Sequence, residues 1–332
     1  MGTVSLYTAE TRRLTKRRFT RLFTLGVLLV LIAIAVGMFA THQRNTPEVV
    51  AAAQAQAGRE YQNAVVQAAQ DRKNCLATAT TPTDCADMWQ PTPADFQAQW
   101  YMPATFIFRE NFPDMVTTLA AILAVLAFVI GASFVGAEWT SGGMMNLLLW
   151  RPRRLQVLGT KLGALLVALT GLTVVLSAIW TGVFAVIAHS RGSVDSMTSG
   201  AWQSIALMEL RGLVMVLAAG AIGFGLASIG RHTAVAMGVI IGVVVLFQFG
   251  LGTVLALANV KFVDAFLIPT WAVAWMDKQI KLEDYNSCIP TPTGCESDTL
   301  TLTWPMAGGL LTAALLLVVG TAMWTLRSRD IT

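Results

Sequence analysis

Six long apolar stretches dominate the sequence and limit what it can fold into. Each holds about 20 or more residues, the length that a helix needs to cross a hydrocarbon core of roughly 30 Å. Only 13% of the 332 residues are charged, whereas about 25% are charged in a soluble domain. We therefore predict an all-α integral membrane protein, with six transmembrane helices and two large extracytoplasmic loops.

The polar segments between the predicted spans differ greatly in size. Two of them, 42–113 and 259–304, are too long to be simple connections and form the two large loops. The third span would be about 45 Å long as a helix, so we expect it to tilt or to project into water. The spans are predicted at 22–41, 114–137, 158–188, 206–229, 233–258 and 305–326. The other segments are a basic N-terminal segment (1–21), a loop at 138–157, a short loop at 189–205 and a tail at 327–332.

Basic residues gather on one side of the predicted membrane. Six spans place both termini on the same side, which then carries 13 of the 23 basic residues and only three of the 19 acidic ones. The positive-inside rule places that side in the cytoplasm, so we expect a multi-pass protein of the cell membrane with both termini cytoplasmic. Residues 1–21 are either a helix lying on an anionic leaflet or a solvated basic tail that only fixes the topology.

The four cysteines agree with this orientation, because all of them fall in the two outer segments. Cys75 and Cys85 are ten residues apart, and Cys288 and Cys295 are seven apart. An oxidising exterior favours disulfides, and the short separations favour these two local pairings among the three that four cysteines allow. No histidine lies near either pair, which makes a zinc site a poor alternative.

The first large outer segment combines a helical pattern with a group of aromatic residues. Weakly apolar residues recur four positions apart between Glu48 and Lys73, which predicts one apolar helix face. The residues of this face are Val49, Ala53, Ala57, Tyr61 and Val65. The aromatic residues that follow, from Trp89 to Phe112, are typical of packing at a membrane interface; a substrate-facing role is the alternative.

The sequence lacks the motifs of several enzyme classes. It has no Gly-Lys dipeptide, and therefore no P-loop that could hold nucleotide phosphates. H-E-x-x-H and G-x-S-x-G are also missing, and the three histidines lie at predicted membrane edges. Ion-coupled transport needs ionisable residues near the middle of the membrane. The ionisable residues of the predicted spans lie at the ends of those spans instead. We expect no catalytic residue, no metal site and no cofactor in this chain, and no nucleic-acid partner.

The polar and small residues inside the spans have two possible roles each. Gln248 lies near the middle of span five, where it either lines a path or hydrogen-bonds a neighbouring helix. The glycines of spans four and five include one G-x-x-x-G pattern, Gly238 to Gly242. Such residues allow helices to pack closely, and a moving interface needs the same residues.

The most distinctive pattern runs from Gly136 to Arg154, with the sequence G-A-E-W-T-S-G-G-M-M-N-L-L-L-W-R-P-R-R. A short helix that begins near Thr140 would present an apolar face. Pro152 would end it, since proline has no N–H and disfavours helix at the residue before it. Taken alone, this loop is an interfacial helix with a basic topology anchor.

Together with Lys161-Leu162, this stretch resembles the pattern G-A-E-[YW]-x-x-G-T-x-x-x-L-L-x-x-P-x-x-R-x-x-x-x-x-K of ABC-2 type transporter permeases. The six-span plan and the basic N-terminus resemble that family as well. Two departures are Gly143, where the pattern has Thr, and the unusually large first outer segment. In that family, loops between spans dock on a separate ATP-binding subunit, which holds ATP and Mg²⁺. The resemblance places these residues at or beside that interface: Glu138, Trp139, Gly142, Gly143, Arg151, Pro152 and Arg154.

The resemblance also implies partners and a function. Two permeases, either two copies of this chain or this chain and a paralogue, would work with two ATP-binding subunits as an exporter. The outer segment before the last span often dips back as short helices, and the apolar residues from Ala265 to Met276 suit that. Uncharged spans favour hydrophobic or amphipathic cargo such as a lipid, drug or peptide. The alternatives are a non-transporting scaffold or sensor with a ligand-binding external domain, and a passive pore, against which the absence of a charged ring argues.

Overall fold

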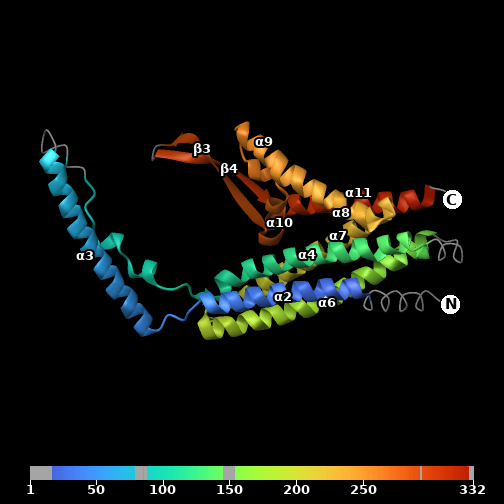
Figure 1. Cartoon of the computed structure of the whole chain (residues 1–332), viewed down its shortest axis with the longest axis horizontal. Helices are drawn as coiled ribbons and strands as arrows, with labels where there is room; N and C mark the ends of the chain where they lie inside the picture. The colour runs from blue at the N-terminus through green and yellow to red at the C-terminus, as the bar shows by residue number, and fades with distance from the viewer. Residues whose placement is uncertain (1–16, 79–84, 86–87, 145–153, 292–293, 329–332) are drawn as a thin grey trace. The chain divides into compact units, whose positions relative to one another are not determined.

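The protein, seen here as a computed structural model, consists mainly of long helices (Figure 1). The structure describes residues 17–78, 85, 88–144, 154–291 and 294–328, without the side chains of residues 154, 285–291 and 295. Within these residues, six helical stretches are long and apolar enough to cross a membrane. The predicted number of spanning helices is therefore confirmed.

Five spans are continuous helices, and α6 is the longest helix of the described residues. All five begin before the predicted apolar limits, and all except α2 also end beyond them. These are α2 (Arg18–Thr41), α4 (Phe108–Thr140), α6 (Arg154–Arg191), α7 (Ser199–Gly230) and α11 (Trp304–Ser328). Helix α6 has 38 residues, about 57 Å of helix, which exceeds the thickness of a hydrocarbon core. The remaining span is composite. It consists of α8 (Thr233–Val243), a π-helical segment η4 (Val244–Leu251) that contains Gln248, and α9 (Gly252–Leu257).

Helix α4 is the centre of the larger compact unit, which comprises residues 1–33, 112–182 and 198–332. Within its most apolar stretch 78% of the residues are buried, against 6% for α2 and 11% for α11. Glycines bring α4 and α7 together: a Cβ on Gly223 would lie 3.1 Å from the Cα of Phe128. A Cβ on Gly238 or Gly242 would meet nothing within 4 Å, so among the described residues this G-x-x-x-G pattern brings no second helix into close contact.

A second unit comprises residues 34–111 and 183–197. Its main element is α3 (Pro47–Thr78), so the predicted helix is confirmed, with Ala53 and Ala57 of the predicted face buried. A disulfide joins Cys75 to Cys85, as predicted. Two short 3₁₀ turns, η2 (Pro93–Asp95) and η3 (Ala98–Tyr101), follow, and the strands β1 (Phe106–Ile107) and β2 (Gly192–Ser193) pair in parallel.

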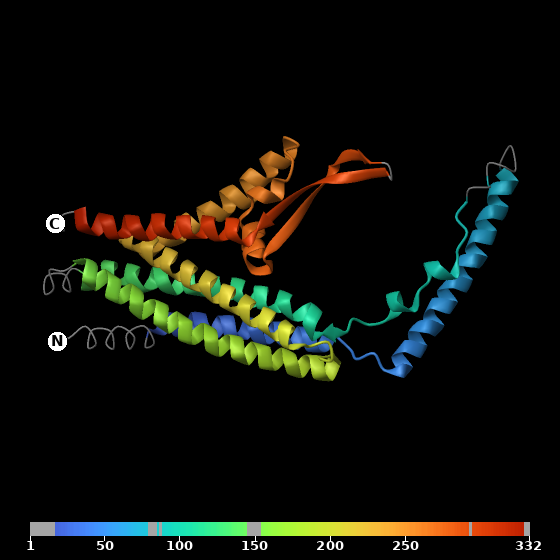
Figure 2. The ribbon, with the colours of Figure 1, turned by 180° about the vertical axis from the view of Figure 1, so that it is seen from behind.

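The all-α prediction is wrong for the segment before the last span. After η5 (Val263–Phe266) and α10 (Ile268–Asp277), the chain forms an antiparallel hairpin of β3 (Gln279–Thr291) and β4 (Gly294–Thr303), visible in both ribbon views (Figure 2). Leu282 and Leu302 pack with Ala274 of α10 and Ala307 of α11, which explains the alternation of apolar residues in the strands. Cys288 and Cys295 lie on this hairpin, but their side chains fall outside the described part, so their pairing stays a prediction.

Candidate functional site

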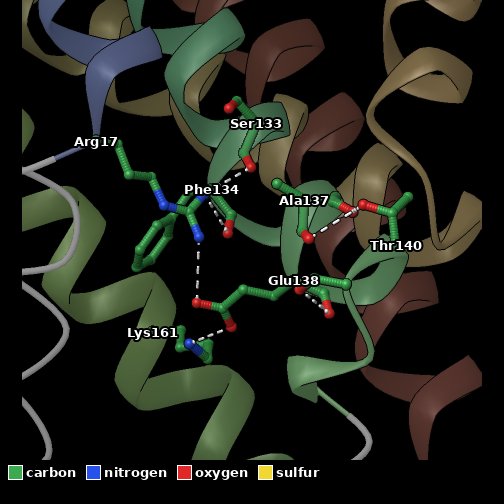
Figure 3. Close-up of polar contacts among 9 residues, drawn as sticks. Arg17, Ser133, Phe134, Ala137, Glu138, Thr140 and Lys161 are labelled. Carbon is green, nitrogen blue, oxygen red and sulfur yellow. Dashed lines mark hydrogen bonds and ion pairs between the residues drawn. The ribbon is translucent and has the colours of Figure 1, made fainter.

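The last turn of α4 carries a glutamate that is enclosed by two cations. One oxygen of Glu138 lies 2.6 Å from Nζ of Lys161 in α6. The other lies 3.4 Å from Nη2 of Arg17, the residue that precedes α2 (Figure 3). Arg17 also donates to the backbone oxygens of Ser133 (3.0 Å) and Phe134 (3.3 Å). A single carboxylate therefore holds the starts of α2 and α6 to the end of α4.

This ionic contact is buried, and its charged groups therefore have to be paired with one another. Lys161 is fully buried and Glu138 is 8% exposed. An isolated charge in such surroundings costs several kcal/mol, so each charge needs its partner. The carboxylate also stands at the negative end of the α4 dipole, where cations are favoured. Both cations face the ring of Phe134, at 5.4 Å for Arg17 and 5.2 Å for Lys161, which adds a cation–π attraction.

The neighbours of Glu138 in the G-A-E-W pattern contact the turn between α7 and α8. A Cβ on Gly136 would lie 2.5 Å from the backbone N of Thr233, so only glycine permits this approach. The guanidinium of Arg231, a residue in the left-handed conformation (φ 53°), lies 5.1 Å from the centre of the Trp139 ring. His232 caps α8 by accepting a hydrogen bond from Ala234 N at 3.0 Å.

We call this assembly the Glu138 junction: Arg17, Gly136, Glu138, Trp139, Lys161 and the turn 231–233. It joins four segments of the larger unit: the start of α2, the end of α4, the start of α6 and the α7–α8 turn. Gly136, Glu138 and Trp139 of the pattern thus each have a contact within the chain. A displacement of the end of α4 would be passed to the other three segments.

The other predicted interface residues divide into two groups. Gly142 lies two residues after the end of α4 with φ +71°, a conformation that favours glycine, and its N–H donates to the carbonyl of Trp139. At Gly143 a Cβ would have ordinary contacts of 3.4 and 3.7 Å, so this position accepts a side chain such as the Thr of the pattern. Arg151 and Pro152, and the side chain of Arg154, lie outside the described residues.

Comparison with known proteins places the chain in a family. Residues 9–326 match the family described as ABC-2 family transporter protein. The chain belongs to the ABC-2 transporter family. It is thus a multi-pass membrane protein and a permease of an ABC transporter, a class that generally leaves ATP hydrolysis to a partner subunit. No curated protein matches the sequence.

Three basic residues of the Glu138 junction, Arg17, Lys161 and Arg231, are not among the site residues that the sequence of this ABC-2 permease predicts. Lys161 belongs to the motif but has no predicted contact. Arg17 lies in the basic segment 1–21, predicted as a helix on an anionic leaflet or a solvated tail, and Arg231 counts among the basic residues that set the topology. Their common signal is position, since each is a basic residue at the same end of a span as Glu138. Which of them reach the carboxylate depends on helix packing, so charge position alone does not identify the pairs.

Proposed function

We propose that this ABC-2 permease is the membrane subunit of an exporter and that the Glu138 junction receives the movement of a separate ATP-binding subunit. The observation that carries the proposal is the convergence of four segments on Glu138, Gly136 and Trp139. The segment 141–153 follows α4 directly, so a partner that grips it pulls on the junction. ATP and Mg²⁺ belong to that partner.

In this scheme the motif residues act in two ways. Glu138 and Gly136 are positioning residues, because their contacts lie within the chain. Trp139, Gly142, Gly143, Arg151, Pro152 and Arg154 lie at or beside the docking surface. Both termini and the junction face the cytoplasm of the cell membrane, and two permeases work with two ATP-binding subunits. The second permease is another copy of this chain or a paralogue.

An apolar cavity supports hydrophobic or amphipathic cargo. It has a volume of about 200 Å³ and lies between α6, α7 and α11. Its polar side chain is Thr312, whose hydroxyl donates to the carbonyl of Gly308 at 2.7 Å. The residues around the cavity are Leu166, Val214, Leu217, Ala218, Ala221, Leu311, Thr312 and Leu315. A site without charge or free hydrogen-bonding groups favours lipids, drugs or apolar peptides over sugars.

Co-expression with a P-loop ATPase encoded beside this gene tests the docking surface. We expect Arg151→Ala to reduce co-purification of the ATPase by about tenfold, a change of about 1.4 kcal/mol. The matched control is Arg44→Ala, which removes an equal charge on the opposite side of the proposed membrane. Equal co-purification of both variants with the wild-type level of ATPase activity contradicts the docking assignment.

Reconstituted complexes test the cargo class. A short hydrophobic peptide should stimulate ATP hydrolysis, whereas a disaccharide should not. The variant Ala218→Phe, which fills the cavity, should abolish the stimulation and leave the basal hydrolysis rate. Stimulation by the disaccharide alone contradicts the proposed cargo.

A further inference from the structure

A second cavity lies between α2, α4 and α6, above the Glu138 junction. It is a groove of about 430 Å³, lined by residues of all three helices. These residues are Thr20, Arg21, Thr24, Leu25, Leu28, Ile130, Ala168, Leu169 and Leu172. The three helices run side by side in both ribbon views (Figures 1 and 2). The groove is open to the surroundings of the helices, and the proposed transport cycle does not use it.

The lining of the groove is divided by chemistry along α2. One end is lined by Arg21 together with Thr20 and Thr24, and the other lining residues are aliphatic. From Arg17 to Thr41 the chain contains no acidic residue, and Arg18 adds a second exposed cation on the same turn. The groove therefore pairs a basic polar end with an apolar channel.

The dimensions suit one leaflet of a bilayer. The lining on α2 extends from Thr20 to Leu28, about 12 Å along a helix axis. Half of a hydrocarbon core is about 15 Å thick. An apolar channel of this length that ends in a cation at the membrane edge matches an acyl chain with a phosphate at its end.

The loose packing of α2 suggests that another molecule fills the groove beside it. Arg17 holds the start of α2 to Glu138, but Leu31 is the buried residue of the helix. Above its anchored start, α2 is bordered by the groove that it shares with α4 and α6. An unfilled apolar gap loses dispersion contacts on both walls, and in a membrane the molecule available to fill it is a lipid tail.

We propose that this groove is a binding site for an anionic phospholipid. One acyl chain lies along Leu25, Leu28 and Leu172, and the phosphate interacts with Arg21. The bound lipid fills the gap between α2 and its neighbours and thereby supports the Glu138 junction from the membrane side. This inference requires insertion of the chain in a bilayer, and it holds whichever cargo the permease moves.

Native mass spectrometry of the full-length chain in mild detergent tests the site. The probes are phosphatidylglycerol and phosphatidylcholine with identical palmitoyl and oleoyl chains. We expect about tenfold more bound phosphatidylglycerol than phosphatidylcholine. Arg21→Gln should abolish this preference, whereas Arg18→Gln, which removes the same charge from a residue outside the groove lining, should retain most of it.

A bulky side chain placed in the groove tests whether the acyl chain binds there. Ala168→Phe should prevent binding of both lipids, and Val167→Phe should not, because Val167 is 56% exposed and lies outside the lining. Equal binding of the two lipids by the wild type, equal effects of the two arginine variants, or lipid retention by Ala168→Phe overturns the proposal. The spectra also report oligomeric state. A loss of dimer with unchanged lipid in Ala168→Phe would assign the groove to a second copy of the chain and overturn it as well. Because Arg21 is exposed, its variant keeps the test decisive if Ala168→Phe fails to fold.

Discussion

Glu138→Gln tests whether the Glu138 junction stabilises the helix bundle. At 2.6 Å and an effective dielectric constant of about 20, the attraction between Glu138 and Lys161 is roughly 6 kcal/mol before desolvation is subtracted. Desolvation of the two ions offsets most of this. Removing one partner, however, leaves Lys161 buried and unneutralised by Glu138, which costs about 3–5 kcal/mol. We therefore expect the free energy of unfolding to fall by about 3 kcal/mol.

Thermal unfolding in detergent, followed by tryptophan fluorescence, measures this loss. At about 2–3 °C per kcal/mol, Glu138→Gln should lower the Tm by roughly 6–9 °C. Lys161→Met should lower it by a similar or smaller amount. The double variant should have a Tm close to that of the less stable single variant, because removing both charges leaves neither of them without its partner. The double-mutant cycle should therefore give an interaction energy of about 2 kcal/mol between Glu138 and Lys161.

The matched control is Glu283→Gln in β3, whose carboxylate lies 3.9 Å from Lys281 in an exposed pair. Exposed pairs contribute about 0–1 kcal/mol, so the control should stay within roughly 2 °C of the wild type. If Glu138→Gln also stays within that range, or if the two single effects add in the double variant, the junction does not bear on stability as argued.

Further predictions concern backbone and charge. Gly142→Ala should cost about 1 kcal/mol by thermal unfolding because of its positive φ, whereas Gly143→Ala should change little. Gly136→Ala should separate α4 from the start of α8 and reduce partner-stimulated ATP hydrolysis; a full wild-type rate would contradict the close contact. The Asp95 carboxylate accepts hydrogen bonds from N (2.7 Å) and Oγ1 (2.8 Å) of Thr92, and these lower its pKa below the ordinary 3.8. The stabilisation that these hydrogen bonds give the folded protein is therefore complete above the ordinary pKa of Asp95. It is lost as the pH falls through the lowered pKa of the folded state. An NMR titration should show this midpoint, and Thr92→Ala should raise it.

Much of the helical architecture could be predicted from local patterns. Apolar runs identified the spanning helices, and the four-residue spacing from Val49 to Val65 identified α3, because burial of one face leaves a periodic trace. The β3–β4 hairpin had such a trace too. Leu300 and Leu302 alternate with Thr299, Thr301 and Thr303, a period of two that the size of the surrounding loop concealed.

The junction could be only partly predicted, because its contacts join distant segments. The motif located Glu138, but Arg17 lies 121 residues away in sequence, and several other basic residues share its side of the membrane. The groove above it leaves no trace in the sequence, since it depends on how α2 stands against α4 and α6. The π-helical register around Gln248 likewise follows from backbone packing that side-chain types do not specify.

The pairing of Arg17 with Glu138 has a consequence for how the chain is threaded during synthesis. Between these residues the chain contains two spanning helices, α2 and α4. The guanidinium and the carboxylate reach the same face of the membrane when both helices cross it. If only one of the two inserts, the charges end on opposite faces, about 30 Å of hydrocarbon apart. A chain that has inserted one of these helices without the other therefore cannot form the ion pair, and it loses the stabilisation that the correctly threaded chain gains.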